Sequence, residues 1–380
     1  MSIRQQNLGS IVKPGFNPLG AQTSVTTYQP YLYSWGIGTS GSLGLGNTTS
    51  YSSPKQVGSL TNWLNITSGK YFSIATKSDG TLWSWGQNDY GQLGLGNISN
   101  RSSPVQVGAL TTWLTIASGY DHTAAVKTDG TLWTWGRNFY GSLGLGNTTA
   151  RSSPVQVGAL TTWLNVACGD NFTLATKTDG TLWSWGDGTE GQLGLGNLTR
   201  YSSPKQIGAL TNWLNISTAT DHAIVVKTNG TLWSWGRNNR GKLGLGNTTS
   251  YSSPKQIGAL TTWYEVSCKS DNSFSIKTDG TLWAWGANNE GQLGLNDIGT
   301  YTARSSPAQV GGLTTWSKIG AGITFTFAVK TDGTLWSWGY NANGELGLGN
   351  TTRYSSPKQV GAATTWLKVA CYSTSLALLY

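Results

Sequence analysis

A unit of about fifty residues is copied along this chain, and this repetition limits the folds that the chain can adopt. Residues 81–96, TLWSWGQNDYGQLGLG, represent the unit best. Similar stretches begin at Thr131, Thr181, Thr231, Thr281 and Thr334, and a more divergent one begins at Tyr31. The Trp-Gly steps of successive copies are fifty residues apart, except for a last interval of fifty-three. A fixed period of this length is typical of repeat architectures.

Each copy contains segments that predict short β-strands. In the copy used as a template these are residues 63–67, 73–77, 81–85 and 103–107. Asp79-Gly80 separates the second and third segments, and such a pair favours a type I′ hairpin turn. One copy has Asn229 in place of the aspartate, which tolerates the same left-handed conformation, so the position serves a turn. Pro104 begins the fourth segment, which predicts an outer strand.

Four short strands per unit, in seven copies, predict an all-β fold, a seven-bladed β-propeller. Leu82 and Ser84 would lie on one face of a blade, and Trp83 and Trp85 on the other, so both faces are expected to be buried. Three Trp slots in each of seven copies give 21 slots. The 20 tryptophans fill all of these except the one that holds Tyr33, which indicates a repeated packing role.

The two ends of the repeat region complement each other. Residues 31–35 correspond to the third strand of a unit, and residues 375–380 correspond to the second strand. The Asp-Gly turn is missing only between them. We therefore expect one blade to contain strands from both ends of the chain, which closes the ring and avoids a partial sheet with exposed edges. The predicted domains are an arm, residues 1–30, and a propeller, residues 31–380.

Residues 1–30 match no repeat and have three prolines and no apolar periodicity, so the segment cannot bury enough surface to fold alone. We expect an extended arm, either a disordered tail or a segment ordered against another molecule. Its candidate anchoring residues are Arg4, Lys13 and Phe16. The arm contains no apolar run long enough for a signal peptide or a membrane span, so a virion or cytoplasmic location without membrane association is expected.

The repeats resemble those of the regulator of chromosome condensation family, whose pattern is D-G-x-L-W-x-W-G-x-N-x-x-G-Q-L-G. Residues 128–141, TDGTLWTWGRNFYG, are one such copy, and the resemblance covers residues 31–380. It implies a seven-bladed propeller. Founding members of the family are guanine-nucleotide exchange factors for a small GTPase, and others bind chromatin or partner proteins. Exchange needs an inserted wedge, whereas this chain has one three-residue insertion near residues 297–303.

A catalytic site requires unlike residues that converge, and equivalent slots of a repeat are expected to lie apart on different blades. His122 and His222 share a slot that holds aromatic or small residues in other copies, so a packing role is expected, in line with the structural histidine of the family. Cys168, Cys268 and Cys371 share another slot on nonadjacent blades, so disulfides are not expected. The sequence predicts no enzyme activity, no metal site and no cofactor.

The net charge of +9 raises the question of an anionic partner. One lysine per repeat fills the same slot. These lysines are Lys77, Lys127, Lys177, Lys227, Lys277 and Lys330. We interpret them as solvated side chains and not as a ring that binds phosphate, so nucleic acid is not an expected partner.

Variation between the copies concentrates directly after the Trp-Gly step. These loops should project on one face of the ring, and tyrosine and arginine are favoured at interface hot spots. The candidate partner-binding residues are Tyr90, Arg137, Phe139, Tyr140, Arg237, Arg240 and Tyr340. The alternative is that these loops vary without constraint.

Three classes of function remain. The first is a non-enzymatic structural or interaction module of a larger assembly, such as a phage virion decoration or a tail-associated or adhesion protein, anchored to other proteins by residues 1–30. The second is an exchange factor or chromatin-binding propeller. The third is a lectin-like propeller that binds a cell-surface glycan.

Overall fold

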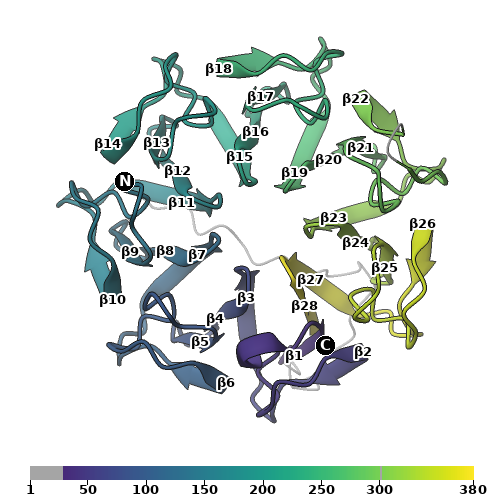
Figure 1. Cartoon of the computed structure of the whole chain (residues 1–380), viewed down its shortest axis with the longest axis horizontal. Helices are drawn as coiled ribbons and strands as arrows, with labels where there is room; N and C mark the ends of the chain where they lie inside the picture. Colours follow the sequence, from purple (N-terminus) through teal and green to yellow (C-terminus); the bar gives the residue numbers. More distant parts are fainter. Residues whose placement is uncertain (1–28, 300–301) are drawn as a thin grey trace, which may run out of the picture.

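The computed structural model describes residues 29–299 and 302–380. In these ranges, 28 strands form seven four-stranded antiparallel sheets, which are arranged as blades around a central axis (Figure 1). A 3₁₀ turn, Thr39–Gly41, is the one helical element within them. No helix of the described residues has the length and apolar character needed to cross a membrane. The predicted seven-bladed β-propeller is confirmed.

In each blade the innermost strand begins at a tryptophan, and the second strand begins at the position that an aromatic ring or a histidine fills in most copies. The innermost strands are β3 (Trp63–Ser68), β7 (Trp113–Ser118), β11 (Trp163–Cys168), β15 (Trp213–Thr218), β19 (Trp263–Lys269), β23 (Trp316–Ala321) and β27 (Trp366–Cys371). The second strands are β4 (Phe72–Lys77), β8 (His122–Lys127), β12 (Phe172–Lys177), β16 (His222–Lys227), β20 (Asn272–Lys277), β24 (Phe325–Lys330) and β28 (Thr374–Leu379).

In each blade the third strand ends with the Trp-Gly step, and the outer strand contains the Ser-Pro pair. The third strands are β5 (Leu82–Gly86), β9 (Leu132–Gly136), β13 (Leu182–Gly186), β17 (Leu232–Gly236), β21 (Leu282–Gly286), β25 (Leu335–Gly339) and β1 (Tyr31–Gly36). The outer strands are β6 (Arg101–Gln106), β10 (Arg151–Gln156), β14 (Tyr201–Gln206), β18 (Tyr251–Gln256), β22 (Arg304–Gln309), β26 (Tyr354–Gln359) and β2 (Tyr51–Gln56).

The ring closes in the blade that both chain ends build. Its strand order is β2-β1-β28-β27, so a strand from the beginning of the chain lies beside one from its end (Figure 1). The two strands pair antiparallel from Tyr31 opposite Leu379 to Gly36 opposite Thr374. The predicted closure is therefore confirmed.

The hydrophobic core is divided into clusters that lie between neighbouring blades. Ile74 and Leu82 of one blade pack in a single buried cluster with Trp113 and Trp135 of the next. Equivalent clusters occur between the other blades. The leucine face of each blade therefore covers the tryptophan face of its neighbour, as the alternation along the third strand predicts.

The tryptophan of each Trp-Gly step also bonds across this interface. The Nε1 of Trp135 donates to the carbonyl oxygen of Gln92 in the preceding blade at 2.9 Å, and the Thr123 hydroxyl donates to the same oxygen. Gly94 lies under the indole, where a Cβ would stand 2.8 Å from Nε1 and φ is +73°. The bond recurs at Trp35, Trp85, Trp185, Trp235, Trp285 and Trp338.

The repeated lysines differ from the sequence-based interpretation. Lys127 is only 6% exposed, and its ammonium stacks on the Trp133 ring, 3.7 Å from the centroid. Burial lowers the pKa of this lysine. The expectation of a fully solvated side chain was wrong, because the aliphatic stem and the ammonium both gain from contact with the indole face.

Removal of residues 376–380 should severely destabilise the protein. The truncation takes most of β28, which pairs with β1 on one side and β27 on the other. We expect a loss of at least about 5 kcal/mol, comparable to the whole stability of a typical domain. Differential scanning calorimetry of the truncated chain, with Tyr380→Ala as a mild control, tests this. An unchanged melting temperature would contradict the closure.

Trp135→Phe should cost about 1–3 kcal/mol, because it removes the cross-blade hydrogen bond and leaves a small cavity in a fully buried cluster. Trp133→Phe is the matched control. Its half-buried indole donates to Thr131 within its own blade, so about 1 kcal/mol or less is expected. Equal losses of unfolding free energy in the two variants, measured by urea denaturation, would show that the cross-blade hydrogen bond contributes no more stability than the bond within the blade.

Candidate interaction face

The loops that vary between copies lie on one face of the ring. Gly86, at the end of β5, pairs with Phe72, at the start of β4. The loop after each Trp-Gly step therefore lies beside the turn between the first and second strands of its blade. We call this side the loop face, and the opposite side, which carries the Asp-Gly turns, the turn face.

A buried asparagine fixes the shape of most of these loops. Asn88 is fully buried, its Nδ2 donates to the carbonyls of Asn97 and Ser99, and its Oδ1 accepts from the Leu93 amide at 2.9 Å. Asn138, Asn238 and Asn341 make the same three contacts. The residues on either side of the asparagine are thus displayed on a rigid support.

Three of the seven candidate residues meet on the loop face. Tyr90 and Phe139 pack edge to face with centroids 5.7 Å apart, and they come from neighbouring blades. The Arg137 guanidinium lies 5.1 Å from the Tyr90 centroid and 4.6 Å from that of Phe139, and it pairs with Asp121 at 3.4 Å. Phe139 is 54% exposed. We call Tyr90, Arg137 and Phe139 the aromatic–arginine cluster.

The other four candidates form separate contacts around the ring. Tyr140 stacks against Arg200 at 4.7 Å, and Tyr340 against Arg353 at 5.7 Å. Arg237 lies within ion-pair distance of Glu190 and Asp221, and Arg240 donates to Asn289. The structure does not bring these four together into one site.

Arg4, Lys13 and Phe16, the candidate anchoring residues, lie outside the described residues.

A buried ion triad supports the loop face near Arg237. Lys242 is fully buried, with its Nζ 2.5 Å from Asp221 and 2.7 Å from Asp271 of the next blade. Burial opposes ionisation of Asp221, but hydrogen bonding from His222 and the charge of Lys242 outweigh it and lower the pKa of Asp221 to about 2. Asp221 therefore stays ionised beside Lys242 of its own blade, and the Lys242–Asp271 pair joins the two blades.

Residues of different blades also meet on the propeller axis, at the loop-face end. The Tyr372 hydroxyl donates to Asp170 at 2.6 Å, and Lys269 lies over the Tyr372 ring at 3.8 Å. Tyr120 packs edge-on against Tyr372, and Lys70 donates to the Tyr120 hydroxyl. We call these five residues the axial cluster.

The axial cluster corrects the expectation that equivalent slots lie too far apart to converge. The five residues come from five blades, but the innermost strands end at the axis, where the radius of the ring is smallest. A signal was present in the sequence. Lys269 and Tyr372 fill a slot that holds glycine in four copies, at Gly69, Gly119, Gly169 and Gly322.

The histidines and cysteines lie in packed surroundings. His122 and His222 are buried, and their Nε2 atoms bond with Thr173 and Ser273 of the next blade at 3.1 and 2.9 Å. Burial lowers the pKa of His122 to about 3. The three cysteines are free thiols, as predicted. In the described part of the chain, no group of three or more His, Cys, Asp or Glu side chains is placed to hold a metal ion.

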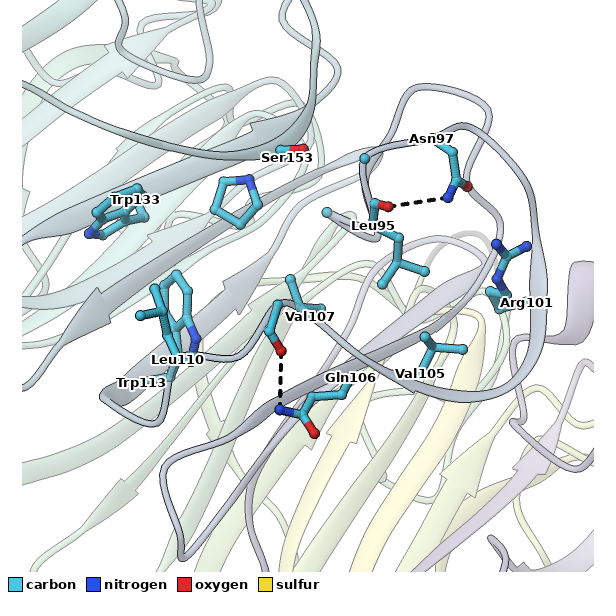
Figure 2. Close-up of a pocket in the computed structure, with 14 residues that line it drawn as sticks. Leu95, Asn97, Arg101, Val105, Gln106, Val107, Leu110, Trp113, Trp133 and Ser153 are labelled. Carbon is cyan, nitrogen blue, oxygen red and sulfur yellow. Dashed lines mark hydrogen bonds between the residues drawn. The ribbon is translucent and has the colours of Figure 1, made fainter.

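Grooves lie between neighbouring blades of the ring. One of about 500 Å³ is lined by Leu95, Val107, Leu110, Trp113 and Trp133, among others (Figure 2). The Trp113 indole N–H has no hydrogen-bond partner among the described residues. Grooves with equivalent linings, of about 330, 400 and 340 Å³, occur at three other blade interfaces.

Known structures with this fold align over almost the whole chain. The human protein WBSCR16 is 21% identical, with a TM-score of 0.82, over 92% of this chain and 98% of its own. Prp20p of Saccharomyces cerevisiae is 20% identical, with a TM-score of 0.81, over 93% and 92%. The same yeast protein bound to Kap60 gives 20% and 0.83 over 99% and 96%. These likenesses establish the fold.

No curated protein sequence matches the chain. The family model of the RCC1-like domain matches residues 32–377, which include nearly all of the predicted propeller. The match confirms the resemblance seen in the repeats, and the chain belongs to the RCC1-like domain family.

Proposed function

We propose that this protein is a non-enzymatic interaction module that binds another protein through its loop face. The aromatic–arginine cluster supports this proposal more than any other feature. It joins an exposed aromatic ring, a second ring and a guanidinium at the junction of two blades. Aromatic and arginine side chains at such a position are the residue types that dominate binding energy in protein interfaces.

The cluster is ordered before any partner arrives. Asn138 holds the loop that carries Arg137 and Phe139, and Asp121 orients the guanidinium. A rigid surface loses little conformational entropy on binding, which favours affinity. No equivalent set of residues occurs in the other copies, so a partner could distinguish this junction from the remaining six.

Protein binding is also consistent with the related structures. Yeast Prp20 is described with binding to Gsp1p and histones and in complex with Kap60. An exchange or chromatin role for this chain stays an alternative, which release of labelled nucleotide from a small GTPase would test.

We further propose that the module belongs to a larger assembly, such as a phage particle, to which residues 1–30 anchor it. This part of the proposal rests on the composition of the arm and the position of Arg4, Lys13 and Phe16 in it. Pull-down of particle proteins with the full chain and with a chain that lacks residues 1–30 tests it. Equal capture by both would exclude anchoring by the arm.

Glycan binding is a second candidate, favoured by the repeated grooves. The groove in Figure 2 is lined by the half-buried Trp133 ring and by the polar side chains of Asn97 and Gln106. Sugar rings pack on aromatic faces, and their hydroxyls accept hydrogen bonds. A glycan array with wild-type protein and Trp133→Ala tests this candidate. Absence of any signal would rule it out.

The combined substitution Arg137→Ala and Phe139→Ala should weaken partner binding by roughly thirty- to several-hundredfold, since each anchor of this type contributes about 1–2 kcal/mol and the two together about 2–4 kcal/mol. Leu110→Ala is the control, because Leu110 is 48% exposed and lies on a loop of the turn face. Immobilised proteins would be compared for what they capture from a cell extract. Identical capture by all three chains would refute the loop-face proposal, and the melting temperatures would show whether the variants are folded.

A further inference from the structure

The central channel contains a cavity of about 230 Å³ that the proposed protein-binding face does not use. Each of the seven innermost strands lines it with three consecutive residues. The side chains there are mostly small, and hydroxyls and thiols are prominent among them. One of the lining residues, Lys269, carries a charge.

Lys269 is buried without a direct ion pair or hydrogen bond in the part of the chain that the structure describes. Its side chain is 5% exposed. The ammonium instead lies over the face of the Tyr372 ring, 3.8 Å from the ring centroid. Burial lowers the pKa of Lys269, and the charge of Asp170 only partly offsets this, because the Asp170 carboxylate accepts the Tyr372 hydroxyl and makes no direct contact with the ammonium. A buried cation that lacks such partners is costly, so a compensating group in the cavity would stabilise it.

Three of the serine hydroxyls around the cavity have a hydrogen that no described residue accepts. Ser217 Oγ accepts from the Cys268 amide and Ser267 Oγ accepts from the Ala321 amide, both at 3.0 Å, which leaves each hydroxyl hydrogen free to donate. The Ser118 hydroxyl, whose oxygen is fully buried, has no partner among the described residues. These three hydroxyls come from three different blades.

Two of the thiols lie against backbone carbonyl oxygens and so leave fewer hydrogen-bond acceptors open at the cavity wall. Cys168 Sγ lies 3.7 Å from the Ala117 carbonyl, and Cys371 Sγ lies 3.9 Å from that of Gly320, so both cover backbone oxygens of the neighbouring strand. Burial raises the pKa of Cys168 to about 12, which keeps this thiol neutral. No carboxylate is among the described residues that line the cavity. The lining therefore offers one positive charge and several donors.

We propose that this cavity is a binding site for a small monovalent anion, of which a halide is the simplest example, held by the Lys269 ammonium and the serine hydroxyls. One ammonium balances one negative charge. A divalent oxyanion would place a second charge near Asp170 without compensation, which disfavours phosphate and sulfate. The volume allows the ion to keep some of its water.

The site has a position-specific origin in the repeat. Glycine is the most frequent residue in the slot of Lys269, so the ammonium is an addition to a slot that the other copies leave without charge. Tyr372 fills the same slot in the closing blade, and the ammonium lies over the face of its ring. Lys269 and Tyr372, the lysine and the tyrosine that stand where most copies have glycine, thus lie in contact with each other.

Bromide is a suitable probe, because its anomalous scattering locates it directly. Crystals of the full chain soaked in sodium bromide should show an anomalous peak within about 3.5 Å of Lys269 Nζ. In solution, chloride or bromide should raise the melting temperature relative to gluconate at equal ionic strength. Lys269→Met should remove this difference, whereas Lys205→Met, which removes an exposed lysine, should keep it.

Each result decides the matter. A cavity that holds only water in the bromide-soaked crystal, or an equal halide response in Lys269→Met and wild type, would overturn the proposal. A peak for sulfate but none for bromide would replace the monovalent anion with a divalent one and also count against it. If Lys269→Met does not fold, the bromide peak in wild-type crystals decides alone. None of these outcomes depends on protein binding at the loop face.

Discussion

The structure depends on one interaction, the contact of a buried indole with the backbone of the preceding blade. At each junction the tryptophan of the Trp-Gly step donates to a carbonyl and rests on a glycine that has no room for a side chain. Neither blade can supply both halves of this contact alone. The requirement explains why tryptophan and glycine positions are preserved from copy to copy, and why an isolated copy would leave its aromatic face in water.

Repetition and function separate clearly in this molecule. The repeated residues build the sheets, the junctions and the rigid loop supports such as Asn88. The residues with distinctive chemistry are those that differ between copies: Arg137 and Phe139 on a loop, Lys242 between two acids, and Lys269 at the axis. An identical scaffold therefore carries unlike surroundings at each of its seven junctions.

Much of the fold could be predicted from the sequence because the residues that form the turns and the blade contacts recur at fixed positions in nearly every copy. The Asp-Gly turn, the Trp-Gly slot and the complementary chain ends led to the correct blade count and closure. The loop candidates were predicted in part, since Tyr90, Arg137 and Phe139 meet but the other four do not.

The axial cluster could not be predicted by comparing equivalent slots. That comparison treats every slot as equally distant from its counterparts, whereas the innermost strands converge on the axis. Tyr372 and Asp170 are 202 residues apart in the chain, and no local pattern connects them. The buried position of Lys127 was likewise missed, because a periodic lysine looks the same in a sequence whether water or an indole lies beside it.

The closing blade has a mechanical consequence. The segment at residue 30 leads directly into β1, which lies inside its sheet with β28 on one side and β2 on the other. A force that pulls this end along the strand direction loads the backbone hydrogen bonds of both strand pairs, β1–β28 and β1–β2, in shear. These hydrogen bonds then resist together instead of opening one at a time. A tether attached here would draw on the strength of the closed ring and not on that of a peripheral strand.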